Sequence, residues 1–255
     1  MIRYEASDRR ATITIDEVER RNPMSAEAMA GLVDATRRAL ADDAVRVLVY
    51  TGAGDAAFCA GGDLSAGFVD DPIGLHHSRG ALADLFRLMV RGGKPTVARV
   101  NGHALAGGFG LAVACDIVVC VDDAKLGTPE INVGLWPMMI SAVLVRSMPR
   151  KAVLELMMTG RIITPDEAHR LGAITHVVSR DELDNVVDEI VGSLASKSPA
   201  VMELGRDSFY AIADMDFDAA LDRLQAGLTA VSLTEDSKEG VQAFLEKRQP
   251  IWQGR

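Results

Sequence analysis

The chain has 255 residues, of which 48% are hydrophobic and 25% charged, a balance typical of a soluble globular protein with a sizeable core. Its net charge of −9 argues against nucleic acid as a partner, because phosphate binding needs a basic face. The three cysteines lack metal-site spacing and the even count of a disulfide framework. There is no apolar signal region and no apolar run that would span a bilayer. We therefore expect a cytoplasmic protein with no metal, membrane or nucleic-acid partner.

The N-terminal elements follow from hydrophobic periodicity. Residues 2–6 and 11–15 alternate like the strands of a hairpin. Ser25 is a plausible N-cap for a helix that ends at Leu40, and residues 45–51 form an apolar, β-rich run.

An irregular polar segment separates this strand from the next helix. Residues 65–78 include Asp70-Asp71-Pro72, which breaks regular structure, and residues 79–90 then read as an amphipathic helix. Loops of this length in a compact domain are often functional, so this one is a candidate cover for a substrate channel.

The middle of the chain repeats a rhythm of strand, turn and helix. A strand at 96–100 leads into a glycine turn and a small apolar helix, and a second strand follows at 117–121. Strands that alternate with helices predict an α/β fold with mainly parallel strands. Thr164-Pro165-Asp166-Glu167 has the pattern of a capping box and predicts a helix start there. From about Asp181 onward the pattern is helical, with start signals at Ser198-Pro199 and at Asp236-Ser237-Lys238-Glu239.

Two glycine turns follow predicted strands, one at Gly61-Gly62 and one at Gly107-Gly108. Glycine lets a ligand approach backbone N–H groups closely, and two such turns can each offer one N–H to a single carbonyl oxygen. Taken singly, a glycine pair more often serves only close packing of a helix on a strand. The presence of two turns favours an oxyanion-binding site.

These turns belong to a series of motifs that resembles the crotonase superfamily, the enoyl-CoA hydratases and isomerases. The resemblance runs in order from Asn22 to the C-terminus. The motifs that carry it are Phe58-Cys59-Ala60-Gly61-Gly62-Asp63-Leu64, Lys94-Pro95, Asn101-Gly102-His103-Ala104-Leu105-Ala106-Gly107-Gly108, Cys115-Asp116-Ile117 and Gly127-Thr128-Pro129-Glu130.

The resemblance implies a crotonase-like spiral of ββα units over residues 1–180 with the acyl-CoA site, and a C-terminal helical trimerisation region over 181–255. It also implies a homotrimer or a dimer of trimers. The expected substrate is an acyl-CoA thioester, and coenzyme A enters as part of that substrate, so no separate cofactor is expected.

Glu130 is the candidate catalytic residue. Its surroundings are mostly apolar, and a partly desolvated carboxylate has a raised pKa suited to proton transfer. From spacing alone, an ordinary solvated glutamate would be the more frequent case. The resemblance reverses this, because Glu130 falls on one of the two acid/base glutamate positions of the family.

The second glutamate position holds Gly110 here, next to Phe109, and glycine cannot move a proton. Hydration of a 2-enoyl thioester usually employs two carboxylates, whereas moving a double bond from position 3 to position 2 needs one base. The sequence therefore favours 3,2-enoyl-CoA isomerisation. A 2-enoyl-CoA hydratase and a non-catalytic acyl-CoA-binding protein remain the alternatives.

The resemblance assigns the other site residues. The oxyanion hole falls on the backbone N–H groups of Gly62 and Gly107. Phe244 and Lys247 match residues that reach CoA in relatives, often from a neighbouring subunit, although a solvated helix face would account for them equally well. The remaining expected CoA contacts are Ala60, Gly61, Gly62, Asp63 and Leu64, and the candidates for an acyl-pocket wall or plain core are Phe109, Trp136, Met138 and Met139.

Overall fold

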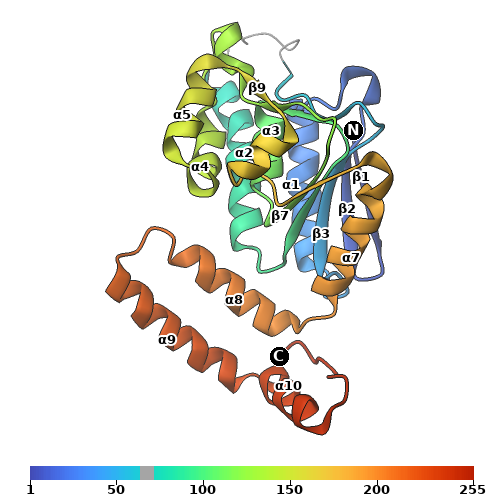
Figure 1. Ribbon diagram of the computed structural model, residues 1–255, viewed down its shortest axis with the longest axis vertical. Coiled ribbons are helices and arrows are strands. Elements are labelled where there is room, and N and C mark those ends of the chain that lie inside the picture. Colours follow the sequence, from blue (N-terminus) through green and yellow to red (C-terminus); the bar gives the residue numbers. More distant parts are fainter. Residues whose placement is uncertain (64–71) are drawn as a thin grey trace.

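The computed structural model describes residues 1–63 and 72–255. Its larger sheet is mainly parallel, with β1 antiparallel to β2 at one edge (Figure 1). In spatial order its strands are β1 (Ile2–Ser7), β2 (Arg10–Ile15), β3 (Val47–Gly52), β5 (Thr96–Val100), β7 (Ile117–Val121) and β10 (His176–Val178). Every residue of the central strand β3 is buried, as expected for a parallel strand covered on both faces.

The strands of a second, smaller sheet directly follow three strands of the first, namely β3, β5 and β7. β4 pairs in parallel with β6, and β6 pairs in parallel with β8, while β9 is antiparallel to β8. In spatial order its strands are β4 (Ala57–Cys59), β6 (His103–Leu105), β8 (Leu126–Gly127) and β9 (Ile162–Ile163). The repeated passage from the large sheet to the small sheet gives the mixed α/β fold that the sequence predicted.

Helices enclose the larger sheet. α7 (Leu183–Ala195) packs against β3, β5 and β7, and α1 (Ala26–Ala41) packs against β1 and β2 with α2 (Pro72–Arg91) beside it (Figure 1). The predicted N-cap of α1 is confirmed, because the Ser25 hydroxyl accepts a hydrogen bond from the Ala28 N–H at 3.1 Å. α2 begins at Pro72 and not at residue 79 as predicted, since proline, the predicted breaker, is also favoured in the first helical turn.

Shorter helices surround the smaller sheet. α3 (Gly107–Val113) follows β6 and packs against α4 (Met138–Ser147), and α5 (Arg150–Thr159) packs against both α4 and the 3₁₀ helix η3 (Pro129–Val133). α6 (Pro165–Arg170) begins at the predicted N-cap Thr164, whose hydroxyl accepts from the Glu167 N–H at 3.3 Å. The 3₁₀ helices η1 (Val18–Arg20) and η4 (Arg180–Glu182) complete this part of the chain.

The last three helices extend away from the core (Figure 1). They are α8 (Pro199–Ala211), α9 (Phe217–Leu233) and α10 (Glu235–Glu246). The predicted start at Asp236 is wrong, because the N-cap is Thr234, whose hydroxyl accepts from the Ser237 N–H at 3.0 Å. The Asp236 carboxylate is fully buried and accepts from Ser198 at 2.6 Å and from Gln253 N–H at 2.6 Å.

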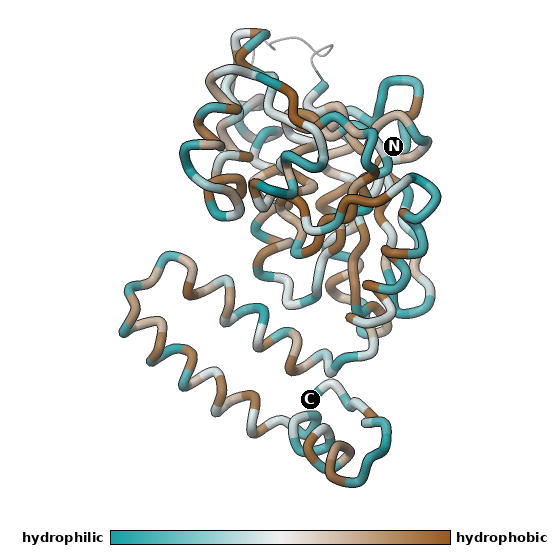
Figure 2. The backbone as a smooth tube through the Cα atoms, viewed as in Figure 1, coloured by the Kyte–Doolittle hydropathy of each residue, from teal (hydrophilic) through white to brown (hydrophobic). Residues whose placement is uncertain are grey.

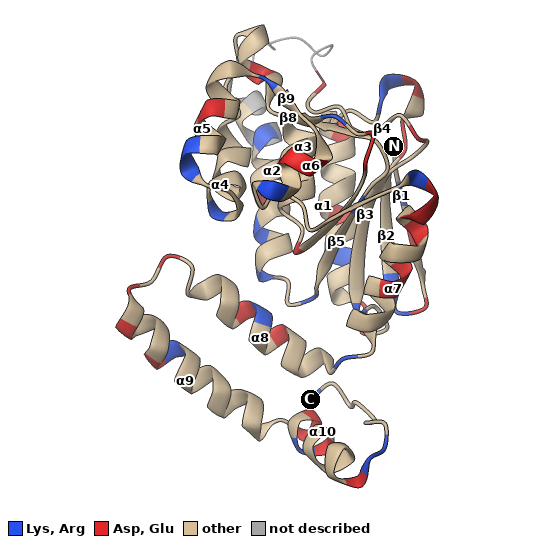
Figure 3. Cartoon of the chain, viewed as in Figure 1, with Lys and Arg blue, Asp and Glu red and all other residues tan. Residues whose placement is uncertain are grey.

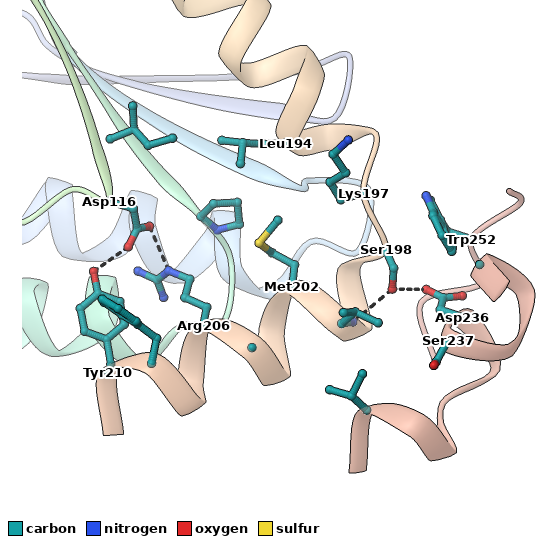
Figure 4. A pocket seen from close by; sticks show the side chains of 17 residues that line it. Asp116, Leu194, Lys197, Ser198, Met202, Arg206, Tyr210, Asp236, Ser237 and Trp252 are labelled. Carbon is teal, nitrogen blue, oxygen red and sulfur yellow. Dashed lines mark hydrogen bonds and ion pairs between the residues drawn. The ribbon is translucent and has the colours of Figure 1, made fainter. Parts of the chain in front are cut away.

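A polar cluster attaches α8 to the core. Asp116, which follows α3, accepts hydrogen bonds from Arg206 Nε at 2.9 Å and from the Tyr210 hydroxyl at 2.6 Å (Figure 4). Arg206 is buried and also donates to the carbonyls of Met89 and Val90 near the end of α2. These hydrogen bonds offset the free-energy cost of burying the Arg206 guanidinium and partly burying the Asp116 carboxylate.

Apolar residues concentrate in the strands and the inner faces of the core helices (Figure 2). Acidic and basic residues are interspersed along both the core and the C-terminal helices (Figure 3). Within residues 1–63 and 72–255, no helix has the length and apolarity needed to cross a membrane.

Candidate functional site

Three neighbouring strands of the smaller sheet bring the predicted site residues to one edge. Cys59 of β4 pairs with Ala104 of β6, and Leu105 of β6 pairs with Gly127 of β8. Because β4, β6 and β8 are parallel, the segments that follow them emerge at the same edge of the sheet. These segments carry Gly62, Gly107 and Glu130, which lie far apart in the sequence.

The two glycine turns are in direct contact. A Cβ added to Gly61 would lie 2.7 Å from the Ala106 Cβ and 3.6 Å from the Gly107 nitrogen. Gly61 also has a φ of +97°, a conformation that other L-residues rarely adopt. Glycine is therefore required at position 61 for the two turns to lie side by side.

The first turn leaves one backbone donor available, that of Gly62. Its neighbours are all engaged, with Ala60 N–H donating to Arg21 O at 3.0 Å, Gly61 N–H to Cys59 Sγ at 3.4 Å and Asp63 N–H to Met24 O at 3.3 Å. No acceptor for the Gly62 N–H is found within the described part of the chain, and a Cβ there would meet open space. The Gly62 N–H can therefore donate to a ligand.

The second turn offers its donor at the start of α3. The Ala106 N–H donates to Gly127 O at 2.8 Å, and the first helical bond runs from Gly110 N–H to Ala106 O at 3.1 Å. The N–H of Gly107 precedes that bond and has no intrahelical acceptor. Two backbone donors without acceptors among the described residues thus lie on adjacent turns, an arrangement that can receive a single carbonyl oxygen.

Glu130 follows β8 and sits in the first turn of η3. Its side chain is half-buried, and its Oε2 is buried with no hydrogen-bond partner among residues 1–63 and 72–255. Desolvation raises the pKa of Glu130, although a hydrogen bond from its own backbone N–H partly offsets the effect. A carboxylate with an open acceptor and a raised pKa is suited to take and return a proton.

The position of the second family glutamate, held here by Gly110, has no space for a side chain. Gly110 is buried in α3, and a Cβ added there would lie 2.1 Å from Ile140 Cγ2 and 2.5 Å from Ile140 Cβ. The side chain of Ile140, from α4, therefore occupies the space that a side chain at position 110 would need. The sequence revealed the missing carboxylate, but it did not reveal Ile140.

The segment from Arg20 to Met24, which includes the start of a stretch that in the family resembles the segment lying along CoA, supports the first turn through contacts that local sequence patterns do not predict. Met24 N–H donates to Gly61 O at 2.7 Å, and a Cβ on Gly107 would lie 2.6 Å from Met24 Cε. Asp63, a predicted CoA contact, forms a salt bridge with Arg20 at 2.7 Å. Met24 therefore contacts both glycine turns, which its backbone and side chain hold together.

The remaining predicted site residues are distributed differently. Phe244 lies on α10 and Lys247 is its C-cap, and both side chains are exposed. This helix packs against α8 and α9, at the far end of the molecule from β8 (Figure 3). One chain alone does not bring them to Glu130. Leu64 lies outside the described residues, as do residues 65–71 of the segment expected to cover a substrate channel, and the rest of that segment belongs to α2. Of the apolar candidates, Phe109 is core, while Met138 and Trp136 are exposed.

A separate cavity of about 720 Å³ lies between the core and the C-terminal helices (Figure 4). Its lining includes Asp116, Met202, Arg206 and Trp252, and it contains none of the predicted site residues. The candidate site lies elsewhere, at the edge of the smaller sheet where the segments with Gly62, Gly107 and Glu130 emerge. Among the described residues, no group of three or more His, Cys, Asp or Glu side chains is placed to hold a metal ion.

Solved structures share this fold. An enoyl-CoA hydratase from Mycobacterium smegmatis superimposes with a TM-score of 0.93 at 30% identity, covering 98% of each chain. Human enoyl Coenzyme A hydratase domain-containing protein 3 gives a TM-score of 0.94 at 28% identity, covering 98% of this chain and 99% of that one. The crotonase-type fold is therefore common to all three.

Sequence comparisons point to the same family as the solved structures. A Thermus thermophilus protein, provisionally named an enoyl-CoA hydratase, is 37% identical over 247 residues, which are 94% of this chain and 96% of the relative. The carnitinyl-CoA dehydratase of Salmonella enteritidis is 32% identical over 248 residues, covering 95% of this chain and 94% of that one. The profile of the enoyl-CoA hydratase/isomerase family matches residues 5–255. The chain is thus an enzyme of the enoyl-CoA hydratase/isomerase family, within the crotonase superfamily.

Proposed function

We propose that this protein is a 3,2-enoyl-CoA isomerase that works with a single carboxylate, Glu130. The observation that carries the proposal is the pairing of an unpartnered Glu130 with a glycine at position 110 whose side-chain space is filled by Ile140. The substrate is an acyl-CoA thioester, and coenzyme A is needed only as part of that substrate.

The reaction follows from the three groups at the sheet edge. The thioester oxygen accepts hydrogen bonds from the N–H groups of Gly62 and Gly107, which stabilise the enolate that forms when a proton leaves C2. Glu130 takes that proton and returns it to C4, so the double bond moves from position 3 to position 2. No second carboxylate takes part in these steps.

The alternative is hydration or its reverse, dehydration, and the names of the relatives favour it. Both the Thermus thermophilus and the Salmonella enteritidis proteins are named for such reactions. Adding water usually requires a second carboxylate to position it, and this chain has no side chain at position 110 to serve. We therefore place isomerisation ahead of hydration.

Restoring a second carboxylate tests this assignment. Gly110→Glu alone is expected to fold poorly, because its Cβ would overlap Ile140 and overpacking costs about 1–3 kcal/mol. The double variant Gly110→Glu/Ile140→Gly removes the overlap. Its 2-enoyl-CoA hydration rate is expected to exceed that of the Ile140→Gly control by roughly 10-fold or more.

Parallel assays of both variants and the wild type with a 2-enoyl-CoA and a 3-enoyl-CoA distinguish the outcomes. Vigorous hydration by the wild type, with no gain in the double variant, would show that position 110 does not limit the chemistry. The one-carboxylate proposal would then be wrong.

The proposed functional unit is a homotrimer or a dimer of trimers. α9 has no buried residue in the single chain, and its leucines at positions 221, 224, 228 and 233 are 36% to 71% exposed. Their spacing places apolar surface along the helix, and large exposed apolar patches usually mark interfaces. A neighbouring copy would cover this surface and bring its own Phe244 and Lys247 to the CoA moiety.

Light scattering coupled to size exclusion checks the assembly. A mass of three or six times the 27.3 kDa chain is expected. Leu228→Glu, which puts a charge on the exposed apolar face, is expected to shift the population toward monomers. A wild-type protein that runs as a monomer at micromolar concentration would contradict the proposal.

A further inference from the structure

Cys59 lies between the two glycine turns and contacts both. Its side chain is fully buried, and its Sγ accepts a hydrogen bond from Gly61 N–H at 3.4 Å. A Cβ added to Gly108, in the second turn, would lie 2.7 Å from the Cys59 Cβ and 2.3 Å from its carbonyl oxygen. The sulfur of Cys59 therefore binds the first turn, while its Cβ and backbone pack against the second.

The bond to Gly61 decides which N–H group is free. Within the described residues, the Cys59 sulfur is the acceptor found for Gly61 N–H, and the adjacent Gly62 N–H has none. Without that sulfur, two consecutive donors would lack partners, and the peptide between them would lose its fixed orientation. The sulfur thus sets the direction of the Gly62 donor.

We propose that Cys59 is a positioning residue of the oxyanion hole, whose sulfur holds Gly61 N–H so that Gly62 and Gly107 receive the thioester oxygen. This rests on the proposed acyl-CoA chemistry. The residue does not act as a nucleophile, since burial raises the pKa of its thiol to about 12 and it is neutral at pH 7.

Two substitutions separate the hydrogen bond from simple packing. Cys59→Ala removes the acceptor, whereas Cys59→Ser keeps an acceptor of similar size. Cys120→Ala and Cys120→Ser are matched controls, because Cys120 is equally buried in β7 and, in the part of the chain that the structure describes, its thiol donates to the neighbouring Val121 carbonyl and holds no N–H group. A purely structural role for Cys59 would make the two alanine variants behave alike.

The readout is the absorption band of bound 2,4-hexadienoyl-CoA, which moves to longer wavelength when hydrogen bonds polarise its thioester carbonyl. Cys59→Ala is expected to lose at least half of the wild-type shift, while Cys59→Ser and both Cys120 variants retain it. For 3-enoyl-CoA turnover, Cys59→Ala should lower kcat by about 10-fold with little change in KM, less than the loss of a whole donor.

A Cys59→Ala variant that folds and keeps the full spectral shift and kcat would overturn the inference. Amide hydrogen exchange in the wild type gives a test that needs no variant, since Gly61 N–H should be protected and Gly62 N–H should exchange fast. Equal, fast exchange at both would also overturn it. A spectral shift that depends on Cys59 in a protein that does not isomerise would refute the proposed function and leave this inference standing.

Discussion

Glu130→Gln is expected to lower kcat for 3-enoyl-CoA isomerisation by roughly 10³-fold, within the range that a positioned acid/base group contributes. The amide keeps the shape of the side chain but cannot accept the C2 proton. KM should change little, because the CoA moiety and the oxyanion hole are untouched. Steady-state kinetics with a 3-enoyl-CoA measure both constants.

Glu189→Gln, an exposed glutamate on α7, is the matched control and should retain wild-type kinetics. Isomerisation that continues at the wild-type rate in Glu130→Gln would remove Glu130 from the mechanism.

The raised pKa of Glu130 predicts how the activity and the stability of the wild type depend on pH. In the wild type, kcat/KM should fall as pH drops through that raised pKa, because the base must be ionised. The folded protein binds this proton more tightly than the unfolded chain, so stability falls as pH rises between the ordinary glutamate pKa and the raised one. Glu130→Gln should therefore unfold at a higher temperature than the wild type at neutral pH, and the difference should vanish below the ordinary pKa.

Arg206→Met is expected to lower the free energy of unfolding by about 2–4 kcal/mol. It leaves the Asp116 carboxylate, whose side chain is 21% exposed, without its cationic partner (Figure 4). The hydrogen bonds to Asp116 from Tyr210 and from Thr96 remain, so the loss of stability is smaller than for a buried carboxylate with no partner at all.

Thermal unfolding should show a midpoint lower by about 5–15 °C, at roughly 2–4 °C per kcal/mol for a chain of this size. Arg87→Met is the control, because the Arg87–Asp84 pair has side chains that are 63% and 51% exposed and contributes little. Equal midpoints for the two variants would show that the cluster does not stabilise the attachment of α8.

Local features of the sequence predicted much of the fold. The caps at Ser25 and Thr164 are confirmed because a capping hydroxyl and the N–H that it serves are only three residues apart. The start of α10 was misplaced because Asp236-Ser237-Lys238-Glu239 has the pattern of a capping box, yet the Asp236 carboxylate is used by Ser198 and the C-terminal tail. Competing tertiary bonds of this kind cannot be read from a local pattern.

The site was predicted only in part for a similar reason. Gly62, Gly107 and Glu130 could be placed through ordered motifs, and the three strands that carry them prove to be neighbours. Ile140 and Gly110 lie on two separate helices. Met24 contacts both glycine turns, although these segments are far apart in the chain. Periodicity and spacing carry no signal for such contacts.

The most direct test of the central claim is to incubate the wild-type enzyme with a 3-enoyl-CoA and follow the products by proton NMR in D₂O. A one-carboxylate isomerase should yield the 2-enoyl-CoA as the main product, with little 3-hydroxyacyl-CoA. A parallel incubation with a 2-enoyl-CoA measures hydration. Rapid formation of 3-hydroxyacyl-CoA there, with no shift of the double bond in the 3-enoyl-CoA, would contradict the proposal and assign the enzyme to hydration.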